Sequence, residues 1–444
     1  MRNSTKDICG RLLSCARLSL LVLIIGVAAF ASVEAEKQLQ DPDPKEREKA
    51  AKILGQEDNP ANVQILATAI QDKDEKVRMA VVKSLIHLGS PSSLDPLTKA
   101  VSDGIPEIRS LAIDGLVNFY LPGYIDTGFG GFFRGIGNKV EGLFSNVDST
   151  VVAADVKADP KVVRTLALSL DGASDMATRA RAGRALGILR ASDAVPELLK
   201  ACFSDNVDLI LAALGAFDKI KDTSVGPRIT FLLNYPQKSV RIAAASTLGV
   251  LRSQEAIPNL ERLFQNSPDD KELRAAALDA LAFMPTNETS PLFVKNLNDK
   301  EKAIRASAAL GLGRLRDASF VETLEKAKAV EKDPGVRLAL DFALVINGKT
   351  DSLGELVSGL SSRVHRGEAR PYLIELARDK AVRDSLKSYL YSKDDNIRED
   401  LCVVYGASGD SSSIPDLEVL LRDRKASVAE EASRAIRLIR ARGV

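Results

Sequence analysis

Two short stretches between Lys238 and Pro268 place apolar residues three or four positions apart. That spacing is typical of one face of an α-helix. A polar break at 253–255 separates the stretches, and Pro258 stands in the first turn of the second, where a missing N–H costs nothing. The pattern predicts two helices joined by a tight turn. Their stripes comprise Val240, Ala243, Ala244, Thr247, Leu248 and Leu251, and then Ile257, Leu260, Leu263 and Phe264.

The same two-helix pattern returns along most of the chain. Its marker is the pair Val240-Arg241, followed eight residues later by an apolar residue and often by Gly. Neighbouring copies lie 31 to 33 residues apart where both are clear, with one gap of 70 between Ile108 and Thr178. Two helices cannot bury both stripes alone, so the copies predict about twelve pairs stacked into an all-α solenoid. The equivalent pairs are Glu46-Arg47, Val77-Arg78, Ile108-Arg109, Thr178-Arg179, Leu209-Ile210, Leu273-Arg274, Ile304-Arg305, Val336-Arg337, Ile397-Arg398 and Val428-Ala429, with a degraded copy near Val364 to Ala377.

The repeated unit resembles the HEAT repeat, specifically the short kind similar to those of phycobilisome bilin lyases. The resemblance covers nearly all of the chain after residue 45, apart from one insertion. It implies an α-solenoid of stacked HEAT-like repeats and indicates little about activity, because such repeats serve many functions. An x-V-R-x-x-A-A-x-A-L-G helix is carried by Val240 to Gly249, Ile304 to Gly313 and Thr178 to Gly187, and an A-[IV]-P-x-L segment by Ala194 to Leu198 and Ala256 to Leu260.

Charge and composition narrow the classes of function. Lys and Arg number 61 against 60 Asp and Glu, so the chain lacks the strong positive charge of a general nucleic-acid binder. We therefore expect no nucleic-acid partner. An aromatic share of 5%, without any Trp, suits closely stacked helices because large rings would push the layers apart.

The N-terminal segment has the pattern of a targeting signal. Four basic residues precede an apolar run of 14 residues from Leu18 to Ala31, and Val33-Glu34-Ala35 offers small residues for cleavage. A membrane span needs about 20 residues, so a cleaved signal peptide at 1–35 is favoured over a retained anchor. We expect the mature chain to begin at Glu36 in a periplasmic or secreted location. The basic residues are Arg2, Lys6, Arg11 and Arg17.

Two cysteines, Cys202 and Cys402, remain after removal of this signal. About six repeats separate them, and packed helix layers are about 8–10 Å apart. The two residues are then far beyond the ~7 Å limit between the Cα atoms of a disulfide. Both are expected to be free thiols that fill core space.

One arginine position recurs in eight copies and forms a predicted arginine ladder. An acid often comes shortly before it. An Asp near a helix start accepts backbone N–H bonds and meets an Arg bidentately, so such pairs are expected to tie successive repeats together. A ligand-binding arginine row is the alternative. The arginines are Arg78, Arg109, Arg179, Arg241, Arg274, Arg305, Arg337 and Arg398, and the acids are Asp74, Asp103, Asp175, Asp270, Asp299, Asp333 and Asp395.

The stretch from about Tyr120 to Asp159 does not follow the repeat. It is rich in Gly and Phe, and Phe129, Phe132 and Phe133 begin a set of apolar residues on one helical face. Its many glycines would make this helix weak in isolation, at about 1 kcal/mol each relative to Ala. The solenoid, a partner or a lipid surface is therefore expected to order it. Peripheral membrane contact through residues 124–145 is one of these alternatives.

Residues expected to face away from the core on the inner helices are apolar in the middle of the array. One interpretation is that these helices bury more than one stripe. The other is a concave apolar groove that binds a protein partner, lined or covered by the Phe-rich insertion. The candidate partner-binding residues are Leu211, Leu214, Ile242, Leu278, Leu310, Leu338 and Phe342, together with Phe129, Phe132 and Phe133.

Catalysis has little support in the sequence. The two histidines, His87 and His365, are about nine repeats apart, and the motifs of common hydrolases, metalloproteases and phosphate-binding loops are absent. We expect no catalytic residues, metal or cofactor. The favoured function is a non-catalytic protein-interaction scaffold outside the cytoplasm. A membrane-associated assembly factor and a bilin-lyase-like subunit are the alternatives.

The expected organisation has four parts. These are a signal peptide or anchor at 1–35, repeats at 36–119, the insertion at 120–159, and repeats from 160 to a C-terminal cap at 444.

Overall fold

The computed structural model describes residues 34–57, 59–125, 151–153 and 156–443. The chain divides into two compact units, Met1–Asp222 and Thr223–Val444, which we call the first and the second unit. Every regular element in the described residues is a helix. Most of the predicted signal peptide therefore lies outside the described residues, as do Phe129, Phe132 and Phe133.

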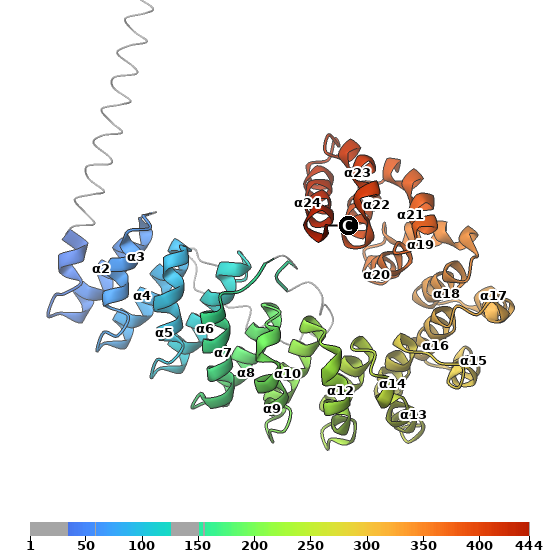
Figure 1. Cartoon of the computed structure of the whole chain (residues 1–444), viewed down its shortest axis with the longest axis horizontal. Helices are drawn as coiled ribbons and strands as arrows, with labels where there is room; N and C mark the ends of the chain where they lie inside the picture. The colour runs from blue at the N-terminus through green and yellow to red at the C-terminus, as the bar shows by residue number, and fades with distance from the viewer. Residues whose placement is uncertain (1–33, 58, 126–150, 154–155, 444) are drawn as a thin grey trace, which may run out of the picture. The chain divides into compact units, whose positions relative to one another are not determined.

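The first unit is a stack of helical pairs that follow one another in chain order (Figure 1). We call the helix that opens each predicted repeat the A helix and the one that follows it the B helix. The A helices of this unit are α2 (Pro44–Gln56), α4 (Glu75–Leu88), α6 (Pro106–Tyr120), α8 (Met176–Ile188) and α10 (Val207–Ile220). The B helices are α3 (Asn62–Thr68), α5 (Leu94–Ala100), α7 (Pro160–Gly172) and α9 (Val195–Ala201).

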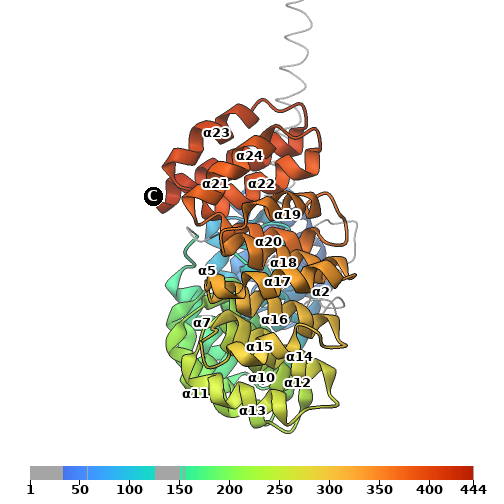
Figure 2. The same ribbon diagram turned by 90° about the vertical axis from the view of Figure 1, so that its right-hand side faces the viewer.

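The second unit continues the same alternation, and in Figure 2 its A helices succeed one another from α14 to α22. Its A helices are α12 (Lys238–Val250), α14 (Lys271–Phe283), α16 (Lys302–Arg314), α18 (Pro334–Ile346), α20 (Arg366–Leu376), α22 (Asp395–Ser408) and α24 (Ala426–Arg442). The shorter helices are α11 (Gly226–Ile229), α13 (Ile257–Gln265), α15 (Ser290–Asn296), α17 (Val321–Val330), α19 (Leu353–Gly359), α21 (Lys380–Leu386) and α23 (Ile414–Leu420). Single 3-10 turns, such as η5 (Thr230–Asn234) and η9 (Lys387–Tyr391), complete several pairs.

These helices confirm the predicted all-α solenoid of about twelve two-helix repeats. Five A helices lie in the described part of the first unit and seven in that of the second. The degraded copy expected near Val364 to Ala377 is helix α20, which contains Pro371.

Several successive A helices approach so closely that only glycine fits at the contact. A Cβ atom on Gly249 of α12 would lie 2.8 Å from the Cα of Ala280 on α14, and one on Gly313 of α16 would lie 2.7 Å from the Cα of Ala343 on α18. The same contact recurs between Gly187 and Ala216 in the first unit and between Gly406 and Ala435 in the second. The glycine of the repeated A-L-G segment thus faces an alanine about 30 residues later.

The inserted segment begins and ends at the same place on the first unit. Helix α6 ends at Tyr120 and α7 begins at Pro160, so the segment separates an A helix from the next B helix. The Tyr120 hydroxyl accepts a hydrogen bond of 2.9 Å from the backbone N–H of Asp159. Near the end of the segment, Val152 is buried and its N–H donates to the carbonyl of Ile188 at 3.0 Å. Both flanks are therefore fixed to the stack.

Cys202 and Cys402 are buried free thiols, as the sequence predicted. Burial raises the pKa of the Cys202 thiol to about 12. It also raises the pKa of the Cys402 thiol to about 12, with a smaller contribution from the acids Glu431 and Asp423. At neutral pH both groups are therefore protonated and belong to the core.

The close approach of the A helices predicts opposite effects for two Gly→Ala substitutions. Gly249→Ala forces a Cβ against the backbone of α14 and should lower the free energy of unfolding by about 1–3 kcal/mol. Gly215→Ala lies inside helix α10 with open space around its Cβ position, so it should raise that free energy by about 0.5–1 kcal/mol. Urea unfolding followed by circular dichroism measures both. Equal effects of the two variants would contradict the proposed contact.

Candidate interaction surface

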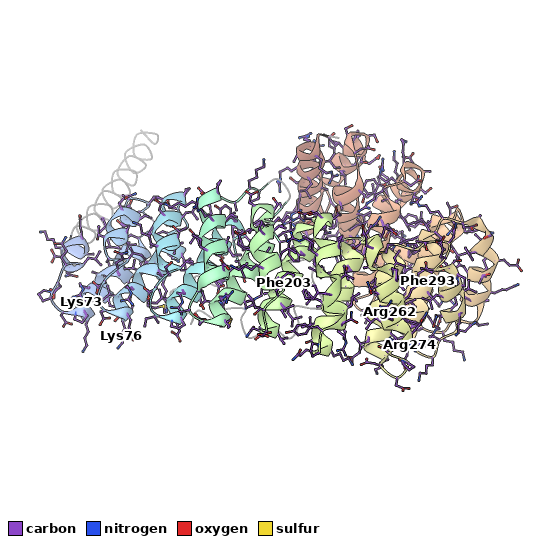
Figure 3. The ribbon with its side chains drawn as sticks, turned by 60° about the horizontal axis from the view of Figure 1, so that its bottom comes forward. Lys73, Lys76, Phe203, Arg262, Arg274 and Phe293 are labelled. Atoms are coloured by element: carbon purple, nitrogen blue, oxygen red, sulfur yellow. The ribbon has the colours of Figure 1, made fainter. Side chains whose placement is uncertain are left out.

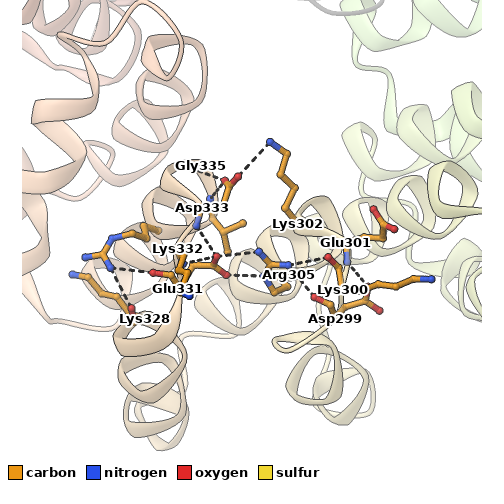
Figure 4. Close-up of polar contacts among 12 residues, drawn as sticks. Asp299, Lys300, Glu301, Lys302, Arg305, Lys328, Glu331, Lys332, Asp333 and Gly335 are labelled. Carbon is orange, nitrogen blue, oxygen red and sulfur yellow. Dashed lines mark hydrogen bonds and ion pairs between the residues drawn. The ribbon is translucent and has the colours of Figure 1, made fainter.

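Arg305 on α16 shows how the predicted arginine position connects neighbouring repeats (Figure 4). Its Nε and Nη2 donate to the two carboxylate oxygens of Glu331 at 2.7 and 3.0 Å, and its Nη1 donates to the carbonyl of Asp299 at 2.9 Å. Asp299 lies in the loop before α16, whereas Glu331 lies in the loop before α18. The guanidinium therefore joins the loop of its own repeat to the loop of the next.

The same arrangement recurs in both units. Arg78, for example, donates to Asp103 at 2.6 and 3.0 Å and to the carbonyl of Asp72 at 2.7 Å. Arg274, labelled in Figure 3, pairs with Asp299 at 2.7 Å and lies 4.8 Å from the ring centroid of Phe264. Arg47 belongs to this set although the predicted ladder omitted it, and Arg383 on the shorter helix α21 makes an analogous pair. The further pairs are Arg47 with Asp72, Arg109 with Asp175, Arg383 with Asp410, and Arg398 with Asp423.

The acidic partners differ from those expected, because the acid that caps an A helix is usually not the acid that pairs with the arginine. Asp74 accepts hydrogen bonds from the N–H groups of Lys76 and Val77 and caps α4, while Asp103 pairs with Arg78. The partner acid follows the arginine by about 25 residues in sequence. Asp175 combines both tasks, since it caps α8 and pairs with Arg109. At α22 the capping residue is Asp394, and Asp395 instead bonds to Arg398.

Three arginines of the predicted ladder bond to no carboxylate in the described residues. Arg241 donates to the carbonyls of Tyr235 and Pro236, Arg179 to the carbonyl of Leu170, and Arg337 to carbonyls at 3.3 and 3.4 Å. Neither Arg241 nor Arg337 has an acid 25 or 26 positions later in the sequence. Arg179 does have Asp205 at 26 positions, but no ion pair joins the two in the described structure.

Where the pair forms, it holds the acid in its charged state. The hydrogen bond from Arg305 lowers the pKa of the Glu331 carboxyl to about 2. Side chains of both partners are largely buried, at 19% and 7% exposure. The guanidinium groups of such pairs are therefore occupied by contacts within the chain.

Most of the apolar residues assigned to a partner-binding groove lie inside the helix stack. Leu278 and Phe342 are 0% exposed, and Leu310 and Leu338 are 6% and 7% exposed. Leu214 is 1% exposed and belongs to the core of the first unit. The expectation that these side chains face a partner is corrected: A helices contact neighbours on both sides and bury more than one stripe. Only Leu211 and Ile242 are half-buried.

The A helices of the second unit instead bring together a set of charged and aromatic side chains. We call it the A-face cluster, and it comprises Asp279, Phe283, Ser307, Arg314, Phe342, Tyr372 and Glu375. Arg314 on α16 donates to Glu375 on α20 at 2.9 to 3.2 Å and to the carbonyl of Ala282 at 3.0 Å. Its guanidinium lies 4.5 Å from the ring centroid of Phe283 and 5.4 Å from that of Phe342. The ion pair therefore spans the intervening helix α18.

Tyr372 extends the cluster along α20. Its ring centroid lies 5.2 Å from that of Phe342. Burial raises the pKa of the Tyr372 hydroxyl, and the charge of Asp279 adds to the effect. This hydroxyl is therefore protonated at neutral pH. Four A helices, α14 to α20, thus contribute to one connected set of side chains, in which Phe342 is fully buried.

Asp279 is the carboxylate of this cluster without an ion-pair partner in the described residues. Its one hydrogen bond there comes from the Ser307 hydroxyl at 3.4 Å, which is long for an O–H···O bond. Burial raises the pKa of the Asp279 carboxyl, although the nearby Arg314 guanidinium and the Ser307 hydroxyl lower it. The ionised form is therefore held at a cost in free energy.

Family comparison follows the repeats seen in the structure. The profile of HEAT repeats matches residues 34–117, 203–282 and 267–345, which together span more than half of the chain. The chain belongs to the HEAT-repeat family. A second profile, the PBS lyase HEAT-like repeat, matches residues 178–204. No curated protein matches the whole sequence significantly.

Several solved HEAT-repeat and related structures are similar to this chain at low identity. The CpcE and CpcF complex of phycocyanin lyase from Nostoc sp. PCC7120 is 16% identical, covers 60% of this chain and 94% of its own, and has a TM-score of 0.38. Importin beta is 13% identical, and the match covers 92% of this chain and 62% of the importin chain, with a TM-score of 0.46. Kap121p bound to Nup53p is 12% identical, covers 93% and 56%, and has a TM-score of 0.45.

The sequence carried a signal for the A-face cluster that periodicity alone did not reveal. Asp279 stands five residues after the repeat arginine, Arg274. Other HEAT repeats of the second unit place Ser246, Leu310 or Phe342 at that position. A charged residue in a position that is small or apolar in these repeats of the second unit marks a departure from their pattern. Comparison of the repeats position by position would have found it.

In the described part of the chain, no group of three or more His, Cys, Asp and Glu side chains is placed to hold a metal ion. Among the same residues, none of the helices has the length and apolar character to span a membrane.

The arginine pairs predict a stability difference between two equivalent positions. Arg305→Ala removes four hydrogen bonds of a charged group and should lower the free energy of unfolding by about 2 kcal/mol. Arg337→Ala is the matched control, since Arg337 is exposed and makes only long contacts to carbonyls, and it should change stability by less than about 0.5 kcal/mol. Thermal unfolding measures both. An unchanged melting temperature for Arg305→Ala would refute the pairing.

Asp279 predicts a pH-dependent gain in stability on substitution. At pH 7 Asp279→Asn removes a carboxylate whose folded-state pKa is raised, so the variant should be more stable than the wild type. As the pH falls through the raised pKa toward 3.8, the wild-type carboxyl becomes neutral and the difference should disappear. Denaturant unfolding at several pH values measures this. The exposed Asp351→Asn is the control, and a loss of stability in Asp279→Asn at pH 7 would contradict the prediction.

Proposed function

We propose that this HEAT-repeat chain is a non-catalytic scaffold, located outside the cytoplasm, that binds a protein partner on the A-helix face of its repeats. A HEAT-repeat solenoid suits a protein-interaction scaffold, because stacked repeats present an extended surface. The A-face cluster is the observation that carries this proposal.

Charged and aromatic groups in this cluster are more than the stacking of repeats requires. Most apolar groups on the A helices are already buried within the stack, as Leu278 and Phe342 show. Burial nevertheless raises the pKa of the Asp279 carboxyl, so its charged form is costly, and Phe283 stands one turn later on α14. Aromatic side chains and charged groups of this kind are enriched at protein interfaces. A partner that supplies a counter-charge would offset the cost.

The reactive groups of the chain support a role without catalysis. Both thiols are buried with raised pKa values, which opposes a nucleophilic role. The Nδ1 atom of His365 lies 3.0 Å from the carboxylate of Glu368, which follows it by three residues. The basic and apolar pattern of residues 1–35 supports the location outside the cytoplasm.

Photo-cross-linking in intact cells of the native host tests the proposal. A photoreactive amino acid replaces Ser246, which is exposed on A helix α12 at the position equivalent to Asp279. The matched control replaces Val419, which is 54% exposed on B helix α23. We expect an adduct of defined mass from position 246 and none from position 419. Sequencing of the purified protein should give Glu36 as its N-terminus.

Two outcomes would overturn the proposal. Equal labelling from both positions would show that the A-helix face has no special affinity for a partner. An intact Met1 N-terminus in the cytoplasmic fraction would refute the location outside the cytoplasm.

A further inference from the structure

Helix α8 of the first unit carries two arginines one turn apart on its A-helix face, Arg181 and Arg184. Arg181 donates through Nη1 to both carboxylate oxygens of Asp114 on α6, at 2.8 and 2.6 Å. Arg184 is half-buried and makes no hydrogen bond or ion pair with any residue that the structure describes. One of two neighbouring guanidinium groups is therefore paired and the other is not.

The unpaired charge of Arg184 cannot be relieved by loss of a proton. Burial lowers the pKa of the Arg184 guanidinium, and repulsion from Arg181 lowers it further. An arginine nevertheless stays protonated in a protein, in contrast to the carboxyl of Asp279, which becomes neutral when protonated. A half-buried guanidinium without an acceptor is therefore destabilising in the free protein. An added acceptor would remove this cost.

Tyr124 adds a further donor at the same place. Burial raises the pKa of the Tyr124 hydroxyl to about 12, with a contribution from the charge of Asp114. The hydroxyl is therefore protonated at neutral pH, and it makes no hydrogen bond to a described residue. Arg181 has also used only Nη1 in its pair with Asp114. Arg184, Arg181 and Tyr124 thus interact electrostatically with one another and carry several N–H and O–H donors.

The balance of charge selects the class of acceptor. The Arg181 and Asp114 pair is neutral as a whole, which leaves the single positive charge of Arg184. Asp208 on α10 acts on Arg184 through space, but it is exposed and forms no ion pair with it in the described structure. A net charge of one suits a carboxylate, which a guanidinium binds through two parallel hydrogen bonds, better than a doubly charged phosphate.

We propose that Arg184, with Arg181 and Tyr124, binds the carboxylate of an acidic segment in the partner protein. Only the source of the carboxylate rests on the proposed function, because the binding chemistry follows from the site itself. The site lies in the first unit and is separate from the A-face cluster of the second unit.

A thermal-shift titration of the full chain tests the inference. The probes are an acetylated and amidated hexaglutamate peptide, sodium acetate at equal carboxylate concentration, and inorganic phosphate. We expect the peptide to raise the melting temperature of the wild type at concentrations at least tenfold below those of acetate or phosphate. Arg184→Gln should weaken this effect at least tenfold, whereas Arg164→Gln, an exposed arginine on α7, should leave it unchanged.

A measurement without ligand gives a second, independent check. Arg184→Gln removes an unpaired charge, so its melting temperature should equal or exceed that of the wild type. A lower melting temperature would show that Arg184 has a structural partner and would overturn the inference. Equal potency of acetate and peptide, or an unchanged peptide effect in Arg184→Gln, would overturn it too. If cross-links from position 246 still formed in either case, the proposed scaffold function would stand without this site.

Discussion

The contact between a glycine on one A helix and an alanine on the next sets the spacing of several neighbouring repeats. With Gly249 against Ala280 and Gly313 against Ala343, these A helices approach at backbone distance. Such contacts leave no room for a side chain to adjust, so each pair of repeats joined in this way is held at a fixed separation. Across one of these contacts, Arg305 reaches from the loop before α16 to the loop before α18.

Different side chains within a repeat pack the helices and connect the loops. The glycine and the apolar stripes hold the helices together, and the arginine with its distant acid joins the loops. The position five residues after the arginine varies: it is apolar and buried in some repeats, as at Leu310 and Phe342, and polar in others. It holds Asp279 in one repeat and Arg184 in another, so opposite charges occupy equivalent places in different units. Repeats of nearly identical backbone can therefore carry different surface chemistry.

The sequence predicted the helices well because their signals are local and repeated. Spacing of apolar residues, prolines in first turns and Asp caps such as Asp74 act within a few residues. Contacts between repeats were harder to assign, since the partner of Arg78 is Asp103 and not the nearer Asp74. The apolar residues Leu278 and Phe342 look like a surface stripe in one helix and are buried by its neighbours. Pairing and burial between repeats depend on the stack, which periodicity within one helix does not describe.

The hydrogen bond between Tyr120 and Asp159 closes the inserted segment at its base. The chain leaves and re-enters the stack at one point. The entropic cost of closing such a loop grows only slowly with its length, by about 0.6 kcal/mol for each doubling. Segments of very different size could therefore occupy this junction while α6 and α7 keep their places. In evolutionary terms the junction is a point where a new module can be acquired without redesign of the repeats around it.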